Sequence, residues 1–134
     1  MDSLYYQPKF YETLRFPYIS VLDKTVEFLP AIESYCPELL IELRGVAVGC
    51  GAEFAEVLML NCRSELMWLF PRVSKTVDGC TTAAVLPEAS DNGHTLLAQN
   101  QDWYTWAGAG GVVLEVVSGS HPDILTITEA GQLA

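Results

Sequence analysis

Hydrophobic residues recur at helical spacing through the first half of the chain. Between residues 20 and 29, apolar side chains fall every three or four positions with charged side chains between them, which predicts a helix that buries one face. Pro30 predicts a bend or a restart of this helix. A second helix is predicted from Pro37, because proline suits the first turn, and it should end at Gly49–Gly51.

A shorter apolar helix follows, and after it comes a polar interruption. The third helix is predicted from about Ala52 to Asn61, with glutamates in its first turns, where the helix dipole favours negative charge. In the next segment, Arg63 has two interpretations. It is either a surface cation paired with Glu65 or an arginine that anchors the loop carrying Cys80.

The spacing changes to that of strands in the second half. Alternating or continuous apolar segments predict four strands, at Thr81–Leu86, His94–Gln101, Val112–Val117 and Ile124–Thr128. Asn92-Gly93, between the first two, is a strong signal for a hairpin turn. The strand that begins at Val112 is apolar on both faces, which is typical of a strand covered on both sides.

The order of these segments predicts an α+β chain, with helices first and antiparallel strands after them. Residues 1–79 would form a helical segment with a linker, and residues 80–134 would form a strand-rich segment. With 134 residues, the chain holds one domain at most. The helices could cover one face of the strands, and the other face would favour self-association of the chain.

The charge of the chain excludes several kinds of partner. Asp and Glu number 17 against 7 Lys and Arg, which gives a formal net charge of -10, so nucleic acids and anionic lipid surfaces are not expected to bind. No apolar run has the length of a membrane span. The N-terminal residues lack the basic start and apolar core of a secretory signal. We expect an intracellular protein, and the choice between cytoplasm and peroxisome stays open.

The cysteines do not have the spacing of a metal site. Cys36, Cys50, Cys62 and Cys80 form no CxxC pair, and neither histidine is at ligand spacing from them. We therefore expect no metal ion and four free thiols. The first three lie in helix-like surroundings and are interpreted as small buried apolar residues.

Cys80 differs, because it follows a glycine where the helices give way to strands. A thiolate is a strong nucleophile and could attack the carbonyl of Gly79, which has no side chain to hinder the intermediate. Hydrolysis of the thioester would free the α-amino group of Cys80. Such an amine is partly neutral near pH 7 and can serve as the base for the thiol. The alternative is a structural cysteine after a turn glycine.

The predicted hairpin brings a carboxylate towards this cysteine. If the turn is centred at or just before Asn92-Gly93, Cys80 lies opposite one of the residues from 102 to 105. Asp102 is therefore predicted to reach the start of the strand that carries Cys80.

Four short segments resemble one enzyme family. Asp78-Gly79-Cys80-Thr81-Thr82-Ala83 and Gln99-Asn100-Gln101-Asp102-Trp103 resemble segments of the acyl-coenzyme A:6-aminopenicillanate acyltransferase (isopenicillin-N acyltransferase) family. These proteins belong to the peptidase C45 group of N-terminal-nucleophile hydrolases. Leu60–Glu65 and Glu42–Gly49 are similar to two further segments of the family, and the resemblance runs from about residue 30 to the C-terminus.

The resemblance implies a zymogen that cuts its own Gly–Cys bond. The products are a small helical α-subunit and a β-subunit that begins with cysteine, folded as an αββα sandwich. By this resemblance, Gly79 and Cys80 form the cleavage point, and Cys80 and Asp102 are catalytic. Arg63 and Asn100 would be supporting residues.

The activity implied is amide hydrolysis or acyl transfer through a cysteinyl thioester, on a small amide or acyl-thioester substrate. No metal or prosthetic group is needed, and a coenzyme A thioester enters as a co-substrate at most. The family's Gly-x-Asn segment and its oxyanion-hole asparagine are absent. The chain is therefore interpreted as an N-terminal fragment with an incomplete sandwich, which is expected to show little or no self-cleavage and no turnover by itself. The alternatives are a non-catalytic interaction fragment and a ceramidase-like cysteine amidase.

Overall fold

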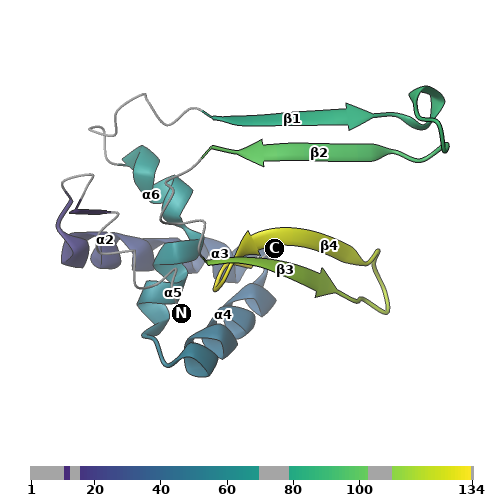
Figure 1. Cartoon of the computed structure of the whole chain (residues 1–134). Coiled ribbons are helices and arrows are strands. Elements are labelled where there is room, and N and C mark those ends of the chain that lie inside the picture. The colour runs from purple at the N-terminus through teal and green to yellow at the C-terminus, as the bar shows by residue number, and fades with distance from the viewer. Residues whose placement is uncertain (1–10, 13–15, 70–78, 103–109, 134) are drawn as a thin grey trace. The chain divides into compact units, whose positions relative to one another are not determined.

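The computed structural model describes residues 11–12, 16–69, 79–102 and 110–133. Helices up to residue 69 are followed by two antiparallel strand pairs (Figure 1), so the predicted α+β order is confirmed. Two compact units are present: Met1–Val73 with Trp106–Ala134, and Ser74–Thr105. The predicted division of the chain into residues 1–79 and 80–134 follows a cleavage point. The compact units do not test that division, so it stays a prediction.

The first predicted helix is divided into three short pieces. Helix α2 spans Tyr18–Thr25, the 3-10 turn η1 spans Val26–Phe28, and α3 spans Leu29–Tyr35 with Pro30 in its first turn. The restart expected at Pro30 is therefore present.

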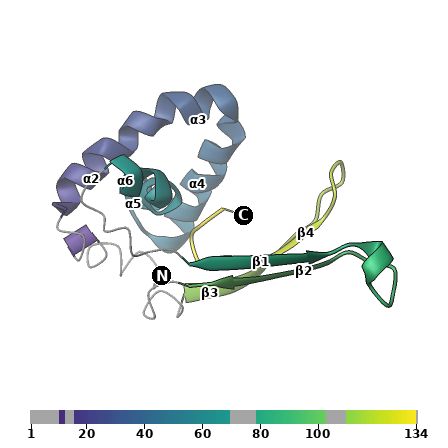
Figure 2. The ribbon, with the colours of Figure 1, turned by 90° about the horizontal axis from the view of Figure 1, so that it is seen from above.

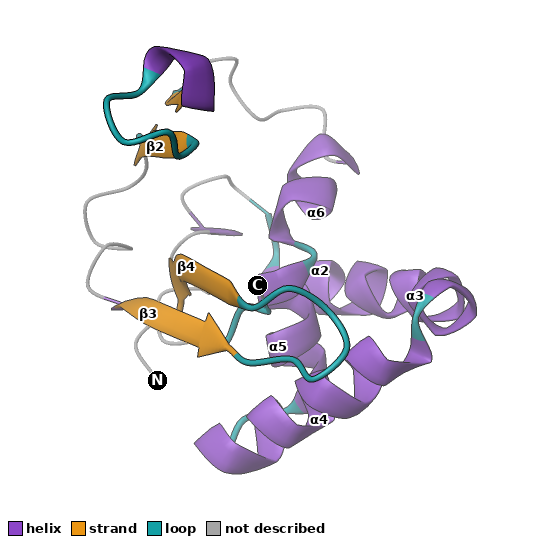
Figure 3. Ribbon diagram, turned by 90° about the vertical axis from the view of Figure 1, so that its right-hand side faces the viewer, coloured by secondary structure: helices purple, strands orange, loops and turns teal. Residues whose placement is uncertain are grey.

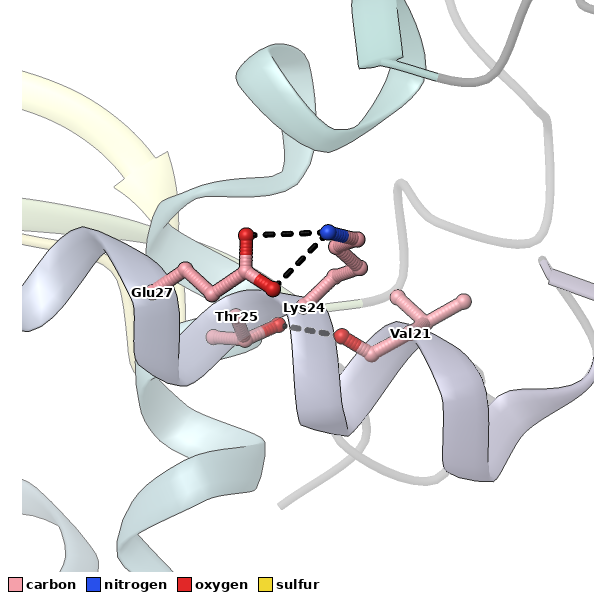
Figure 4. Close-up of polar contacts among 4 residues, drawn as sticks. All are labelled: Val21, Lys24, Thr25 and Glu27. Atoms are coloured by element: carbon pink, nitrogen blue, oxygen red, sulfur yellow. Dashed lines mark hydrogen bonds and ion pairs between the residues drawn. The ribbon is translucent and has the colours of Figure 1, made fainter.

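Side-chain hydrogen bonds mark the end of α2. The Thr25 hydroxyl donates to the carbonyl of Val21 at 2.8 Å, and Lys24 contacts Glu27 at 2.8 Å on the exposed side (Figure 4). A threonine that donates back to the preceding turn tends to bend a helix. The change from α2 to the tighter turn η1 occurs at this position.

Helices α4 and α5 match their predictions closely. Helix α4 spans Pro37–Cys50 and ends as expected, with Gly51 in the left-handed conformation. Helix α5 spans Phe54–Asn61, and Glu53 and Glu56 form a capping box at its start. The Glu56 carboxylate also accepts a hydrogen bond of 3.0 Å from the hydroxyl of Tyr18, which joins α5 to α2.

Helix α5 is the centre of the helical core. Val57, Leu58, Met59 and Leu60 are all fully buried, so this helix is covered on every side at its middle. Helices α2, α3 and α4 follow a curved path around it (Figure 2). Val21 and Leu43 supply buried contacts from that surrounding layer.

A helix that the hydrophobic pattern did not predict follows α5. Helix α6 spans Arg63–Leu69, and the Leu66 amide donates to the carbonyl of Cys62 at 2.9 Å. The polar residues around Arg63 hid its helical spacing, although Leu66 is fully buried.

The strand pair β3–β4 belongs to the same unit as these helices. Strand β3 spans Gly111–Val116 and β4 spans Ile124–Glu129, in antiparallel register. The segment after β4 is held beside α5 (Figure 3), because the Asn61 amide group donates to the carbonyl of Gly131 at 2.9 Å and accepts from the Leu133 amide at 2.8 Å.

A buried ion pair joins β4 to α6. The Arg63 guanidinium donates to both carboxylate oxygens of Glu129, at 3.0 and 2.8 Å, and both side chains are close to 90% buried. The interpretation of Arg63 as a surface cation paired with Glu65 is therefore wrong. Its partner lies 66 positions away along the chain, which a local charge pattern cannot indicate.

The exposed side chains of β3 and β4 are largely apolar. Val113 and Ile127 face each other across the two strands, and their exposed fractions are 70% and 80%. The pattern of Val112–Val117 is typical of a strand covered on both sides, and in this chain the helices were expected to cover one face at most. Val113 and Val117, at 70% and 74% exposed, lie on an uncovered face. Among those residues, no helix is long and apolar enough to cross a membrane.

We expect the ion pair between Arg63 and Glu129 to be important for stability. Arg63→Met should lower the free energy of unfolding by about 3 kcal/mol, because it leaves the buried carboxylate of Glu129 without its cation. Lys24→Ala is the matched control, since it breaks an exposed pair and should cost under about 1 kcal/mol. Denaturant unfolding measures both, and equal losses would contradict the assignment.

The exposed strand faces predict self-association. Size-exclusion chromatography with light scattering should show dimers or larger species of the chain, because apolar strand faces and edges favour pairing with other copies. Ile127→Lys should shift the distribution towards monomer. Ser120→Lys adds the same charge at an exposed turn and should not. A monodisperse monomer of the unmodified chain would contradict this prediction.

Candidate active site

Three of the five predicted site residues meet Cys80 at the open end of one hairpin. Strand β1 spans Cys80–Val85, and β2 spans Leu96–Gln101, with the 3-10 turn η2, Pro87–Ala89, in the connection. Gly79 precedes β1, Asn100 lies in β2, and Asp102 follows it directly. All of these residues belong to the unit Ser74–Thr105.

The register of this hairpin lies one residue outside the predicted range. Cys80 pairs with Gln101, not with a residue from 102 to 105. The strands pair until Val85 meets Leu96, and the connection beyond that pair includes η2. Asn92-Gly93 therefore lies to one side of the turn rather than at its centre.

The one-residue difference decides which side chains share a face. Facing residues of an antiparallel pair point to the same side, and successive residues alternate. Cys80 therefore shares a face with Gln101, whereas Asp102 and Asn100 belong to the opposite face. Asp102 reaches the start of the strand that carries Cys80, as predicted, but its carboxylate belongs to the face opposite the Cys80 thiol.

Asp102 lies instead against Gly79. A Cβ atom built on Gly79 would stand 2.6 Å from the Cβ and 2.7 Å from Oδ2 of Asp102, closer than real Cβ contacts allow. The amide of Asp102 donates to the carbonyl of Gly79 at 2.7 Å. The hydrogen bond therefore reaches the carbonyl of the bond that was predicted to be cut.

Asn100 connects the two strands at the same end. Its amide nitrogen donates to Oδ1 of Asp102 at 3.2 Å, and its Oδ1 accepts from the Thr81 amide at 2.8 Å. Cys80, Asn100 and Asp102 are exposed, so water has access to this end of the hairpin. Sequence reasoning had singled out Asn100 but gave no sign of its contact with Thr81.

Arg63 belongs to the other unit, where it binds Glu129. Its second interpretation, as an anchor for the segment before Cys80, concerns residues 70–78 and lies outside the described residues. The pattern missed Glu129 as a partner, although Arg63 within an apolar stretch was a signal that some acidic partner exists.

The four cysteines are free thiols with different environments. Cys62 is buried as expected, and burial, followed by the charge of Glu65, raises the pKa of its thiol to about 11. Cys36 and Cys50 are only half-buried, so their assignment to the core was wrong, and Cys80 is exposed.

Within the described part of the chain, no group of three or more His, Cys, Asp or Glu side chains could hold a metal ion.

Alkylation should separate Cys62 from Cys80. At pH 8, iodoacetamide should label Cys62 about 100-fold more slowly in the folded chain than in the unfolded chain, because its thiol is buried and its raised pKa keeps it protonated. Raising the pH towards 11 should speed that labelling. Exposed Cys80 should be labelled first, as peptide mapping would show. Equal rates for the two cysteines in the folded chain would contradict this picture.

The chain is similar to a fungal acyltransferase over most of its length. It is 34% identical over 95 residues to the acyl-coenzyme A:6-aminopenicillanic-acid-acyltransferase 40 kDa form of Emericella nidulans, a match that covers 71% of this chain and 25% of that protein. The chain thus spans about a quarter of the curated relative it matches. No protein-family model and no solved structure matches it. The similarity supports a relation to this acyltransferase family.

Proposed function

We propose that this chain is the self-cleaving N-terminal part of a cysteine N-terminal-nucleophile amidohydrolase or acyltransferase. The observation that carries the proposal is the Gly79–Cys80 bond itself, with an exposed cysteine at the first position of β1 and a hydrogen-bonded carbonyl before it. The similarity to the fungal acyltransferase supports the same class of chemistry.

The proposed cleavage proceeds through an acyl shift. The sulfur of Cys80 forms a bond to the carbonyl carbon of Gly79, and the bond from that carbon to the nitrogen of Cys80 breaks as the nitrogen takes a proton. Water then hydrolyses the thioester, which leaves a carboxylate on Gly79 and a free thiol and amine on Cys80. The amine can then act as base for the thiol towards an external acyl group.

The external substrate would be a small amide or an acyl thioester, with coenzyme A as a co-substrate at most. In this proposal β1–β2 and β3–β4 are parts of an αββα sandwich, and Asp102 acts from the Gly79 side of the bond. The matched relative is about four times as long as the matched region. Turnover of an external substrate is therefore proposed for the whole protein and not for these residues alone.

A second candidate is a non-catalytic interaction fragment. The exposed apolar pair Val113 and Ile127 favours it, because such faces commonly bind other chains. In that case the Gly79–Cys80 bond would stay intact, so the experiment below separates the two candidates.

Intact-mass measurement tests the cleavage. Incubation of the purified chain near pH 8 with a small thiol, 2-mercaptoethanesulfonate, should slowly give residues 1–79 as a thioester and residues 80–134 with a free N-terminal cysteine. Cys80→Ala should give neither product, because it removes the nucleophile. Cys36→Ala is the matched control and should react like the unmodified chain. The proposal fails if neither this chain nor a longer protein that contains it gives products that depend on Cys80.

A further inference from the structure

We infer that the main-chain amide of Asp102 is the oxyanion donor for cleavage of the Gly79–Cys80 bond, and that Asn100 is the positioning residue that holds it. This inference rests on the proposed self-cleavage. It gives Asp102 a role through its backbone rather than as a base for the thiol.

The first argument is the contact with the reacting oxygen. The Asp102 amide lies 2.7 Å from the carbonyl oxygen of Gly79, at the short end of the range for such hydrogen bonds. When the sulfur of Cys80 adds to the carbonyl carbon, the electron pair of the C=O double bond moves onto this oxygen. A donor that is already in place stabilises that charge without reorganisation.

The second argument is the direction from which each group approaches. Carbonyl groups of paired strands point along the sheet towards the neighbouring strand, and side chains project from its two faces. Gly79 and Asp102 lie directly beyond the last strand pair, Cys80 with Gln101, so the Asp102 amide is expected to meet the Gly79 oxygen near the plane of the carbonyl, where donors prefer to lie. The Cys80 side chain projects from a face of the strand, the side from which a nucleophile adds to a carbonyl carbon.

The third argument is the support that Asn100 gives to this arrangement. Its side chain accepts from the Thr81 amide on β1 and donates to the Asp102 carboxylate after β2. It thus ties the start of β1 to the residue that follows β2. Asn100 holds Asp102 by its carboxylate, and the main-chain amide of Asp102 contacts the carbonyl oxygen of the bond to be cut.

The fourth argument is the space at Gly79. Any side chain there would meet the Asp102 side chain at 2.6 Å and would push it away from the carbonyl. The close approach of Asp102, rather than an unusual backbone angle, requires glycine at this position. The contact therefore also explains which residue can precede the nucleophile.

A pair of proline substitutions tests the donor. Asp102→Pro removes the amide hydrogen, and thiol-dependent cleavage should become at least about 100-fold slower, the usual effect of losing one oxyanion donor. Gln101→Pro is the matched control, because an amide one position along an antiparallel strand points away from its partner, and it should stay within a few-fold of the unmodified rate. Asp102→Ala keeps the amide and should cleave faster than Asp102→Pro.

Two further variants separate positioning from simple folding. Asn100→Ala should slow cleavage at every pH, whereas Asn100→Asp should recover relative to the unmodified chain as the pH falls and its protonated carboxyl donates again. Gly79→Ala should slow cleavage, and the added change Asp102→Gly should restore part of the rate by removing the clash.

The outcomes distinguish this inference from the function on which it rests. Cleavage that depends on Cys80 but proceeds equally well in Asp102→Pro overturns the inference and leaves the proposed function standing. Equal losses in the two proline variants overturn it as well. If neither the unmodified chain nor a longer protein that contains it gives a Cys80-dependent product, both fail. Circular dichroism of each variant checks that the secondary structure is kept.

Discussion

Asn61 is the last residue of a helix that is buried on every side at its middle, and Arg63 begins the next helix, so their polar groups need partners inside the protein. An unpaired amide or guanidinium in that position would carry a large desolvation cost. The strand β4 and the residues after it supply the partners, as Glu129 binds Arg63 and the backbone around Gly131 binds Asn61. The same polar contacts therefore pair the buried groups at the end of α5 and attach the strand pair β3–β4 to the helices.

Burial also shifts the pKa values of titratable groups in the helical part of the chain. Burial raises the pKa of Tyr18, and its hydrogen bond to Glu56 adds to that effect. Burial likewise raises the pKa of Cys62. These groups therefore stay neutral in the pH range where proteins usually work. Among the described residues, the one buried cation is Arg63, and it is paired with the carboxylate of Glu129.

The helices could be predicted from sequence because their signals are local. Periodic apolar positions, Pro37 and Gly51 marked the bounds of α4 almost to the residue. Helix α6 escaped prediction, since its first residues are polar for a tertiary reason, the contact of Arg63 with β4. The partner of Arg63 could not be found either, because no local pattern encodes a contact between residues so far apart.

The candidate site shows how a small error in register changes the chemistry. The sequence indicated correctly that Cys80 and Asp102 belong to one end of a hairpin. A shift of one residue moves every side chain to the other face of a strand. The Asp102 carboxylate consequently lies over Gly79 and away from the side chain of Cys80. Turn signals such as Asn92-Gly93 locate a hairpin well, but they do not fix its centre when the connection holds a 3-10 turn.

The contacts of Asn61 and Arg63 have a consequence for any chain cut before Cys80. Both residues precede that bond, and their partners Glu129, Gly131 and Leu133 all follow it. Cutting the bond would turn these internal contacts into an interface between two polypeptides. Before the cut, the covalent chain holds the two sides at a high effective concentration. After the cut, the buried ion pair and the backbone hydrogen bonds to Asn61 would have to keep them together, so the affinity between the pieces would be set by contacts within the unit Met1–Val73 with Trp106–Ala134 and not by residues of the cysteine's own unit.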